Sequence, residues 1–120
     1  MAVVLDHMSV PARDRVATAE WYAQVFGVRY QGPRRDYAPV ALSSALTLNF
    51  EEGEISEHHH YAFRVELAEF HGVQQRLLAA GVPFGSTTRE MDGQAYAREG
   101  LLGFYFNDPN GHGLEIIAAE

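Results

Sequence analysis

The sequence contains neither cysteine nor lysine. Without cysteine the chain forms no disulfides and no thiolate zinc sites, so histidine, aspartate and glutamate are its strong metal ligands. Without lysine it cannot form a lysine Schiff base, and its 9 basic residues are all arginines. The formal net charge is -7, and no basic stripe is present. We therefore expect no nucleic-acid partner, because phosphate neutralisation dominates that affinity.

Long apolar runs are also missing, since a membrane span needs about 18 or more consecutive apolar residues. The N-terminal stretch MAVVLDHM lacks both the basic region and the cleavage pattern of a signal peptide. We therefore expect a cytoplasmic protein that has no membrane partner. With 120 residues, 47% of them hydrophobic, the chain is long enough for a single domain with one core, residues 1–120.

The first half of the chain predicts one helix among short strands. Alternating polarity predicts a strand over residues 3–10 that Pro11 ends, and Asp14 and Gly27 are the expected start and stop of an amphipathic helix. Further strands are expected over residues 28–30, 37–42 and 45–50. The acidic stretch 51–57 is the expected connector between halves.

The second half repeats this order. A strand over residues 59–65 precedes an amphipathic helix over 67–80, for which Gly81 is the expected stop. Strands are then expected over residues 82–87, 101–107 and 114–118, with a DPNG turn at 108–111 before the last one. The polar loop 88–100 is predicted to be a lid that carries Tyr96 and Arg98, or else an ordinary surface loop.

An internal repeat organises the whole chain. His7 lies 20 residues before Gly27, and His60 lies 21 residues before Gly81. Residues 1–50 and 59–120 thus predict two βαβββ repeats of the α+β class, which form a cupped mixed sheet with the helices on the outside. We expect the chemistry of the protein inside this cup.

The pleat of the strands selects the candidate residues. In HHHYAFRV the aromatic and apolar residues suit the helix side, which directs His60 and Arg64 into the cup; His7 and Glu115 are directed there by the same alternation. A carboxylate buried on such a sheet needs a partner, and a cation supplies one. The alternative is that Glu115 pairs with Arg64 and that hydrogen bonds satisfy the histidines.

Three motifs, LDHMSV, HHHYAFRV and GFYFNDPNGHGLEII, resemble the vicinal oxygen chelate superfamily, also called the glyoxalase, bleomycin-resistance and extradiol-dioxygenase family. The resemblance covers nearly the whole chain, and FYFNDPNGHGLE is most similar to the fosfomycin-resistance thiol transferases. It implies metal ligands at His7, His60 and Glu115, and it selects His60 over His58 and His59. Two imidazoles and one carboxylate suit one divalent ion of iron, manganese, nickel or zinc.

Departures from the family patterns limit the reaction. The bacterial glyoxalases carry a fourth ligand, a glutamate, where this chain is expected to have Ala45. The resemblance places Ser9 at a hydroxyl position and Tyr105 at a substrate-binding tyrosine of the fosfomycin enzymes. Those enzymes also use a lysine, which this chain lacks, so fosfomycin is not the expected substrate.

The resemblance therefore implies a divalent-metal-dependent enzyme that acts on a small oxygen-chelating substrate as a lyase, a thiol transferase or a ring-cleaving dioxygenase. A thiol co-substrate and a homodimer, with His7 serving a site of the partner, also follow from it. Arg64 is expected to hold an anionic substrate or to pair with a glutamate, and Tyr96 and Arg98 are further substrate-binding candidates. The alternative is a metal-free protein of the bleomycin-resistance type that sequesters its ligand.

Overall fold

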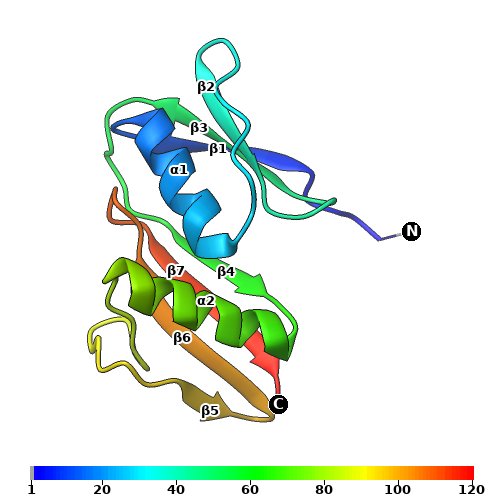
Figure 1. The fold of residues 1–120 in the computed structure, drawn as a ribbon, viewed down its shortest axis with the longest axis vertical. Coiled ribbons are helices and arrows are strands. Elements are labelled where there is room, and N and C mark those ends of the chain that lie inside the picture. The colour runs from blue at the N-terminus through cyan, green and yellow to red at the C-terminus, as the bar shows by residue number, and fades with distance from the viewer. Residues whose placement is uncertain (1) are drawn as a thin grey trace. The chain divides into compact units, whose positions relative to one another are not determined.

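The structure is a computed structural model that describes residues 2–120. The chain divides into two compact units, a first unit that ends at Ser56 and a second unit that spans Glu57–Glu120. Each unit has one helix and one mixed sheet (Figure 1), so the predicted α+β class with two repeated units is confirmed. That residues 1–120 act as a single domain stays a prediction. Within the described residues, no helix has the length and the apolar character needed to cross a bilayer.

The first unit is a three-stranded sheet with one helix. Its elements are β1 (His7–Ala12), α1 (Arg15–Phe26), β2 (Tyr37–Ala41) and β3 (Thr47–Glu52). The strand order is β1-β3-β2, with β1 parallel and β2 antiparallel to β3. The helix begins and ends as predicted, because the Asp14 carboxylate accepts a hydrogen bond from the Ala17 amide at 3.0 Å and Gly27 has a φ of 69°.

The second unit is a four-stranded sheet covered on one face by its helix. Its elements are β4 (His60–Arg64), α2 (Leu67–Ala80), β5 (Tyr96–Arg98), β6 (Leu101–Asn107) and β7 (Gly113–Ala119). The strand order is β4-β7-β6-β5, with β4 parallel to β7 and the other pairs antiparallel. Buried side chains on one face of β6 and β7 pack against α2, where the rings of Phe70 and Phe104 lie 4.9 Å apart. The opposite face of this sheet is not covered by α2 and includes Glu115.

Two predicted strands are wrong for the same physical reason. Residues 28–30 form no ladder, because the Val28 amide donates to Ala23 O at 3.0 Å and thereby completes the end of α1. Residues 82–87 likewise start with the Val82 amide bonded to Leu77 O, and only Gly85 pairs with β6, as a single bridge to Tyr105. The prediction that Pro11 ends the first strand is also wrong. β1 is an edge strand, and such a strand tolerates a residue without an amide hydrogen.

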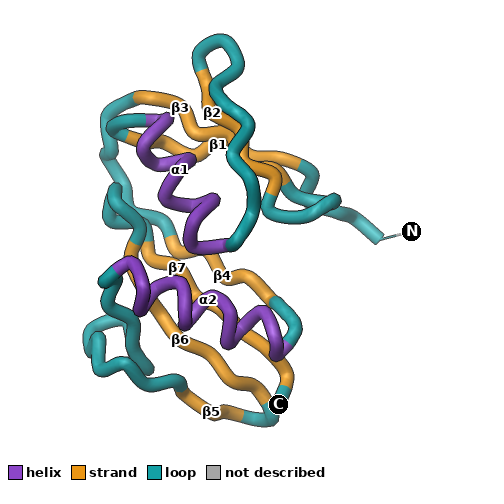
Figure 2. The backbone as a smooth tube through the Cα atoms, viewed as in Figure 1, coloured by secondary structure: helices purple, strands orange, loops and turns teal. Residues whose placement is uncertain are grey.

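The segment predicted to be a lid is partly a strand. Tyr96 and Arg98 belong to β5 and pair with β6, so the prediction that a loop carries them is wrong. The loop between α2 and β5 is drawn as continuous coil in Figure 2. The Asp92 carboxylate closes it by accepting from the amide and the hydroxyl of Ser86, at 3.0 and 2.8 Å. These bonds lower the pKa of Asp92.

Candidate functional site

The candidate site of the second unit lies on the face of its sheet that α2 leaves uncovered. On β7 the side chains of Leu114 and Ile116 are fully buried on the helix side, which directs Glu115 to the opposite face. The sheet register aligns Glu115 with Ala62 on one side and with Tyr105 on the other. The alternation read from the sequence therefore agrees with the placement of Glu115.

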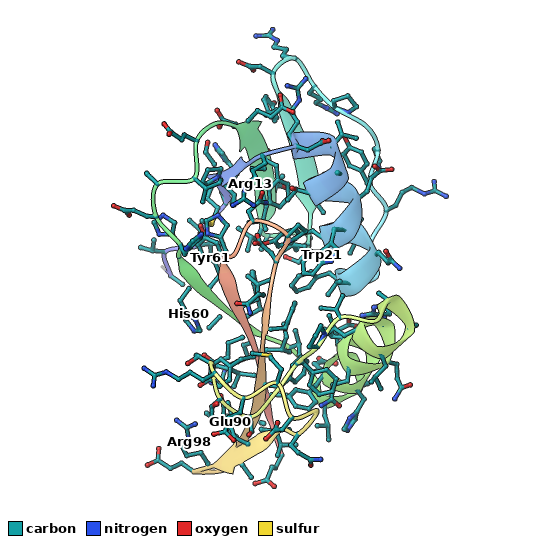
Figure 3. The ribbon with its side chains drawn as sticks, turned by 90° about the vertical axis from the view of Figure 1, so that its left-hand side faces the viewer. Arg13, Trp21, His60, Tyr61, Glu90 and Arg98 are labelled. Atoms are coloured by element: carbon teal, nitrogen blue, oxygen red, sulfur yellow. The ribbon has the colours of Figure 1, made fainter. Side chains whose placement is uncertain are left out.

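Glu115 is held by two side chains from the two edge strands. His60 on β4 brings Nε2 to 2.9 Å from Oε1, and the hydroxyl of Tyr96 on β5 donates to Oε2 at 2.5 Å. Only 12% of the Glu115 side chain is exposed, so its carboxylate depends on these partners. The alternative pairing of Glu115 with Arg64 is not found within the second unit. Figure 3 shows His60 on β4 and Arg98 on β5.

A glycine on β6 makes room for the tyrosine. Gly103 is opposite Tyr96 in the register, and a Cβ added to Gly103 would lie 2.1 Å from the Tyr96 ring. The ring therefore crosses β6 where β6 has no side chain and reaches β7 beyond it. The guanidinium of Arg98 lies 4.3 Å from the centre of this ring. Burial and the hydrogen bond to Glu115 raise the pKa of Tyr96, so its hydroxyl stays a donor at neutral pH.

His60 is positioned by a buried histidine. The His59 amide donates to His112 Nδ1 at 3.1 Å, and the Gly113 amide donates to His59 O at 2.8 Å. His112 is fully buried behind the turn that joins β6 and β7. This contact could not be predicted from the sequence, because no local pattern links residues 59 and 112. His58 and His59 lie outside the strands, so the strand predicted from residue 59 begins one residue later, at His60.

Two further predicted residues share this face. The Tyr105 ring lies 6.0 Å from that of His60 and 5.7 Å from that of Tyr96. Arg64 follows His60 on the same face of β4 and is exposed, and it has no charged partner within the second unit. The structure therefore brings His60, Glu115 and Tyr96 into direct contact and places Tyr105 beside them. The substrate roles of Tyr105, Arg64, Tyr96 and Arg98 stay predictions.

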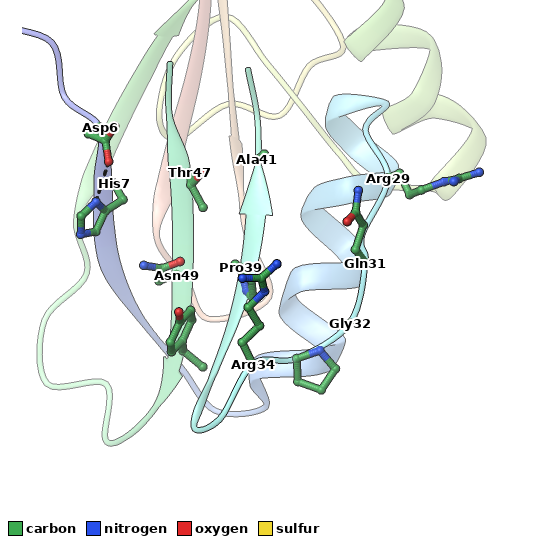
Figure 4. A pocket seen from close by; sticks show the side chains of 12 residues that line it. Asp6, His7, Arg29, Gln31, Gly32, Arg34, Pro39, Ala41, Thr47 and Asn49 are labelled. Carbon is green, nitrogen blue, oxygen red and sulfur yellow. Dashed lines mark hydrogen bonds and ion pairs between the residues drawn. The ribbon is translucent and has the colours of Figure 1, made fainter. Parts of the chain in front are cut away.

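His7 and Ser9 belong to the first unit. His7 is the first residue of β1, as His60 is of β4, and it is exposed. Its Nδ1 lies 2.8 Å from Asp6 Oδ2 (Figure 4), which leaves Nε2 available. Ser9 is exposed on the same face of β1, and its catalytic role stays a prediction.

The register of the first sheet corrects the position that matches Glu115. Asn49 is opposite Ser9 in the pair β1–β3, as Glu115 is opposite Ala62 in the pair β4–β7. The expectation that Ala45 takes this place is wrong, because Ala45 lies in the turn before β3. The first unit therefore has an uncharged amide where the second has a carboxylate.

Neither unit, within the described residues 2–120, gathers three histidine, aspartate or glutamate side chains that hold a metal by themselves. His60 and Glu115 nevertheless fit one metal ion. Two donor atoms that each lie about 2.1 Å from one metal ion, with a right angle between them at the ion, are about 3.0 Å apart. His60 Nε2 and Glu115 Oε1 lie 2.9 Å apart, which is close to that separation. A metal on this pair needs its remaining ligands from outside the second unit.

Comparison with known proteins identifies relatives. The model of the Glyoxalase/Bleomycin resistance protein/Dioxygenase superfamily matches residues 4–116. The structure of Oxidase ChaP-H1 is 30% identical with a TM-score of 0.87, over 99% of this chain and 98% of that chain. The structure of Oxidase ChaP-H2 is 29% identical with a TM-score of 0.87, over 100% of this chain and 96% of that chain.

A more distant structure shares the fold. The fosfomycin resistance protein FosX from Listeria monocytogenes is 20% identical with a TM-score of 0.76, over 100% of this chain and 96% of that chain. No curated protein matches the chain.

Replacing Gly103 tests the crossing of β6 by Tyr96. Gly103→Ala is expected to lower the free energy of unfolding by about 1–3 kcal/mol, because the new Cβ overlaps the Tyr96 ring. Urea denaturation measures this change. Gly53→Ala is the control, since nothing lies within 4 Å of a Cβ added there, and it should leave stability nearly unchanged. Equal stability of the two variants would contradict the crowded crossing.

Removing one hydroxyl tests the Tyr96–Glu115 bond. Tyr96→Phe is expected to cost about 1–3 kcal/mol, because a mostly buried carboxylate oxygen loses its donor. Tyr105→Phe makes the same chemical change without losing a hydrogen bond within the second unit and should cost less. Because folding raises the pKa of Tyr96, its contribution is complete below the unfolded pKa near 10.0 and falls at higher pH. Urea denaturation should therefore show a smaller difference in the free energy of unfolding between wild type and Tyr96→Phe above pH 10.0 than at neutral pH.

Proposed function

We propose that this chain, which belongs to the Glyoxalase/Bleomycin resistance protein/Dioxygenase superfamily, is a divalent-metal-dependent enzyme that acts on a small oxygen-chelating molecule. The observation that carries the proposal is the His60–Glu115 pair. Its donor atoms lie 2.9 Å apart on the uncovered face of the second sheet, and Tyr96 fixes the other carboxylate oxygen. An imidazole and a carboxylate are ligands that iron, manganese, nickel and zinc accept.

The hydroxyl of Tyr96 supports a ligand role for Glu115. Carboxylates that bind metals are themselves hydrogen-bonded, and these partners set the orientation of the ligand. Here Tyr96 occupies Oε2, so Oε1 is the oxygen directed to His60. The pair is thus prepared to face one ion.

His7 is the proposed third ligand because of the repeat. It opens β1 as His60 opens β4, and both strands run parallel to the last strand of their own unit. Its Nδ1 faces the Asp6 carboxylate at 2.8 Å, a contact that orients a metal-binding imidazole by its other nitrogen. Asp6 would thus act as a positioning residue for His7.

The bound ion would supply Lewis-acid catalysis or, for iron, reactivity with oxygen. The residues of the chain do the rest. Tyr105 presents a hydroxyl beside His60 as a hydrogen-bond donor to the substrate, and Arg64 and Arg98 place positive charge on the same face for a substrate that carries negative charge.

Among the reactions of the superfamily we favour oxidation. The two oxidases ChaP-H1 and ChaP-H2 are 30% and 29% identical to this chain over nearly its whole length, whereas FosX is 20% identical. The chain also lacks lysine, which the fosfomycin-type transferases use. A lyase or a thiol transferase is therefore the less favoured assignment.

A metal-free ligand-binding protein of the bleomycin-resistance type is the second candidate. One observation favours it: His60 and Glu115 satisfy each other directly, so the pair does not require an ion to be stable. Metal analysis separates the two candidates.

Metal content is the first test. Protein purified without chelators is expected to hold one divalent ion per chain by elemental analysis, and His60→Ala should lose it. His58→Ala is the control, since it removes an imidazole from the same histidine run but not the one that faces Glu115. Wild-type protein without metal would sink the enzyme proposal and leave the ligand-binding protein. Full metal retention in His60→Ala would exclude His60 as a ligand.

Oxygen uptake is the second test. Iron(II)-loaded protein is expected to consume dissolved oxygen together with a catechol-type substrate, and Glu115→Gln should abolish this uptake. An oxygen electrode and product analysis by mass spectrometry measure it. Parallel assays with glutathione and an α-ketoaldehyde, or with glutathione and an epoxide, should show no turnover. Turnover of a thiol without oxygen uptake would instead assign a lyase or a transferase.

A further inference from the structure

The first unit carries a cavity on the face of its sheet that lies away from the buried core. Its volume is about 530 Å³, within the range of small-molecule pockets. Strands β1, β2 and β3 form its floor, and the segment 29–34 lines its side (Figure 4). The cavity lies within the first unit and includes His7.

The charge of this cavity differs from that of the chain. The chain has a net charge of -7, yet Arg29 and Arg34 line the cavity against a single carboxylate, Asp6, which contacts His7 at 2.8 Å. Asn49 keeps the floor uncharged at the position where the second unit has Glu115. The lining residues therefore carry two arginines against one carboxylate, a formal charge of 2 - 1 = +1, in a chain whose net charge is -7.

Arg34 is the cation best placed to bind a ligand. Figure 4 shows the Arg29 side chain directed away from the sheet and the Arg34 side chain alongside β2. Within the first unit no carboxylate pairs with Arg34, whereas Arg15 is already engaged with Glu52 at 3.2 Å. Its guanidinium is therefore free to bind an anion with two parallel hydrogen bonds.

The backbone of Arg34 is fixed before any ligand binds. Its amide donates to Tyr37 O at 2.9 Å and its carbonyl accepts from the Tyr37 amide at 3.1 Å. Arg15 Nη2 also donates to Arg35 O at 3.4 Å, which ties this turn to α1. A fixed turn lowers the entropic cost of holding the guanidinium at the cavity.

The remaining lining is of two kinds. Pro39 and Ala41 on β2 offer apolar surface, and Thr47 and Asn49 on β3 offer a hydroxyl and an amide. A ligand that matches this lining has an apolar body, hydrogen-bonding oxygens and one anionic group.

We propose that the cavity binds a small organic carboxylate, with its carboxylate on the Arg34 guanidinium and its apolar body against Pro39 and Ala41. The binding of a carboxylate in this cavity does not depend on the proposed function. That this carboxylate is the substrate does rest on the proposed function, because His7, which lines the cavity, is the proposed third metal ligand. The proposal thus narrows the substrate class from oxygen-rich molecules to organic acids.

The test uses metal-free, full-length protein and benzoate as the probe, with backbone amide NMR as the readout. Benzoate is expected to shift the resonances of the cavity residues Thr47 and Asn49 saturably, and its neutral analogue benzamide should bind much more weakly. Arg34→Gln is expected to weaken benzoate binding about tenfold, the value of a hydrogen-bonded charge pair. Arg35→Gln removes the same charge one residue further along the turn and is the matched control.

Several results would overturn the proposal. These are equal affinity for benzoate and benzamide, unchanged benzoate affinity in Arg34→Gln, equal losses in Arg34→Gln and Arg35→Gln, or no saturable shifts at millimolar benzoate. Tighter binding of inorganic phosphate than of benzoate would remove the requirement for an apolar body. The benzoate test uses metal-free protein, so its outcome does not depend on whether the protein binds a metal. A failure of benzoate binding can therefore be told apart from a failure of the metal test on His60→Ala. The amide spectrum of each variant also shows directly whether it is folded.

Discussion

The burial of one carboxylate organises the second unit. Glu115 lies on β7 with 12% of its side chain exposed, and an ionised group so placed is costly unless it is paired. Its partners come from both edges of the sheet, His60 from β4 and Tyr96 from β5. The two edge strands are thus connected through side chains on the uncovered face as well as through the backbone ladder. A charge held in this way is oriented, which is the property that a ligand or an acid–base group requires.

Small and buried residues elsewhere in the unit keep these partners in reach. Gly103 leaves the space through which the Tyr96 ring passes over β6, and Gly113 lies opposite His60 in the register. His112 carries no substrate role in this scheme, yet its Nδ1 accepts the amide hydrogen of the residue before His60. The site therefore depends on backbone and core features that have no chemistry of their own, and changes at these positions act on Glu115 indirectly.

The parts of this arrangement that follow from local pattern could be predicted from the sequence, and the parts that depend on long-range pairing could not. Alternation along β4 and β7 placed His60 and Glu115 on one face, and Asp14 and Gly27 marked the ends of α1. The strand expected over 82–87 failed because the Val82 amide bonds to Leu77 O at the end of α2, and only Gly85 reaches β6, as a single bridge to Tyr105. The Tyr96–Glu115 bond was missed because nothing near residue 96 indicates a partner on β7.

The two units place different side chains at equivalent positions of their sheets. In each, a histidine opens the first strand, and the register then fixes a second position on the strand beside it, Asn49 in the first unit and Glu115 in the second. The carboxylate makes the second unit suited to a cation, and its nearest partners are an imidazole and a hydroxyl. The amide removes that negative charge from the first unit, where Arg34 faces a cavity without a carboxylate partner in that unit. The difference at this one register position supports the proposals of a metal ion on Glu115 of the second unit and of an organic anion on Arg34 of the first.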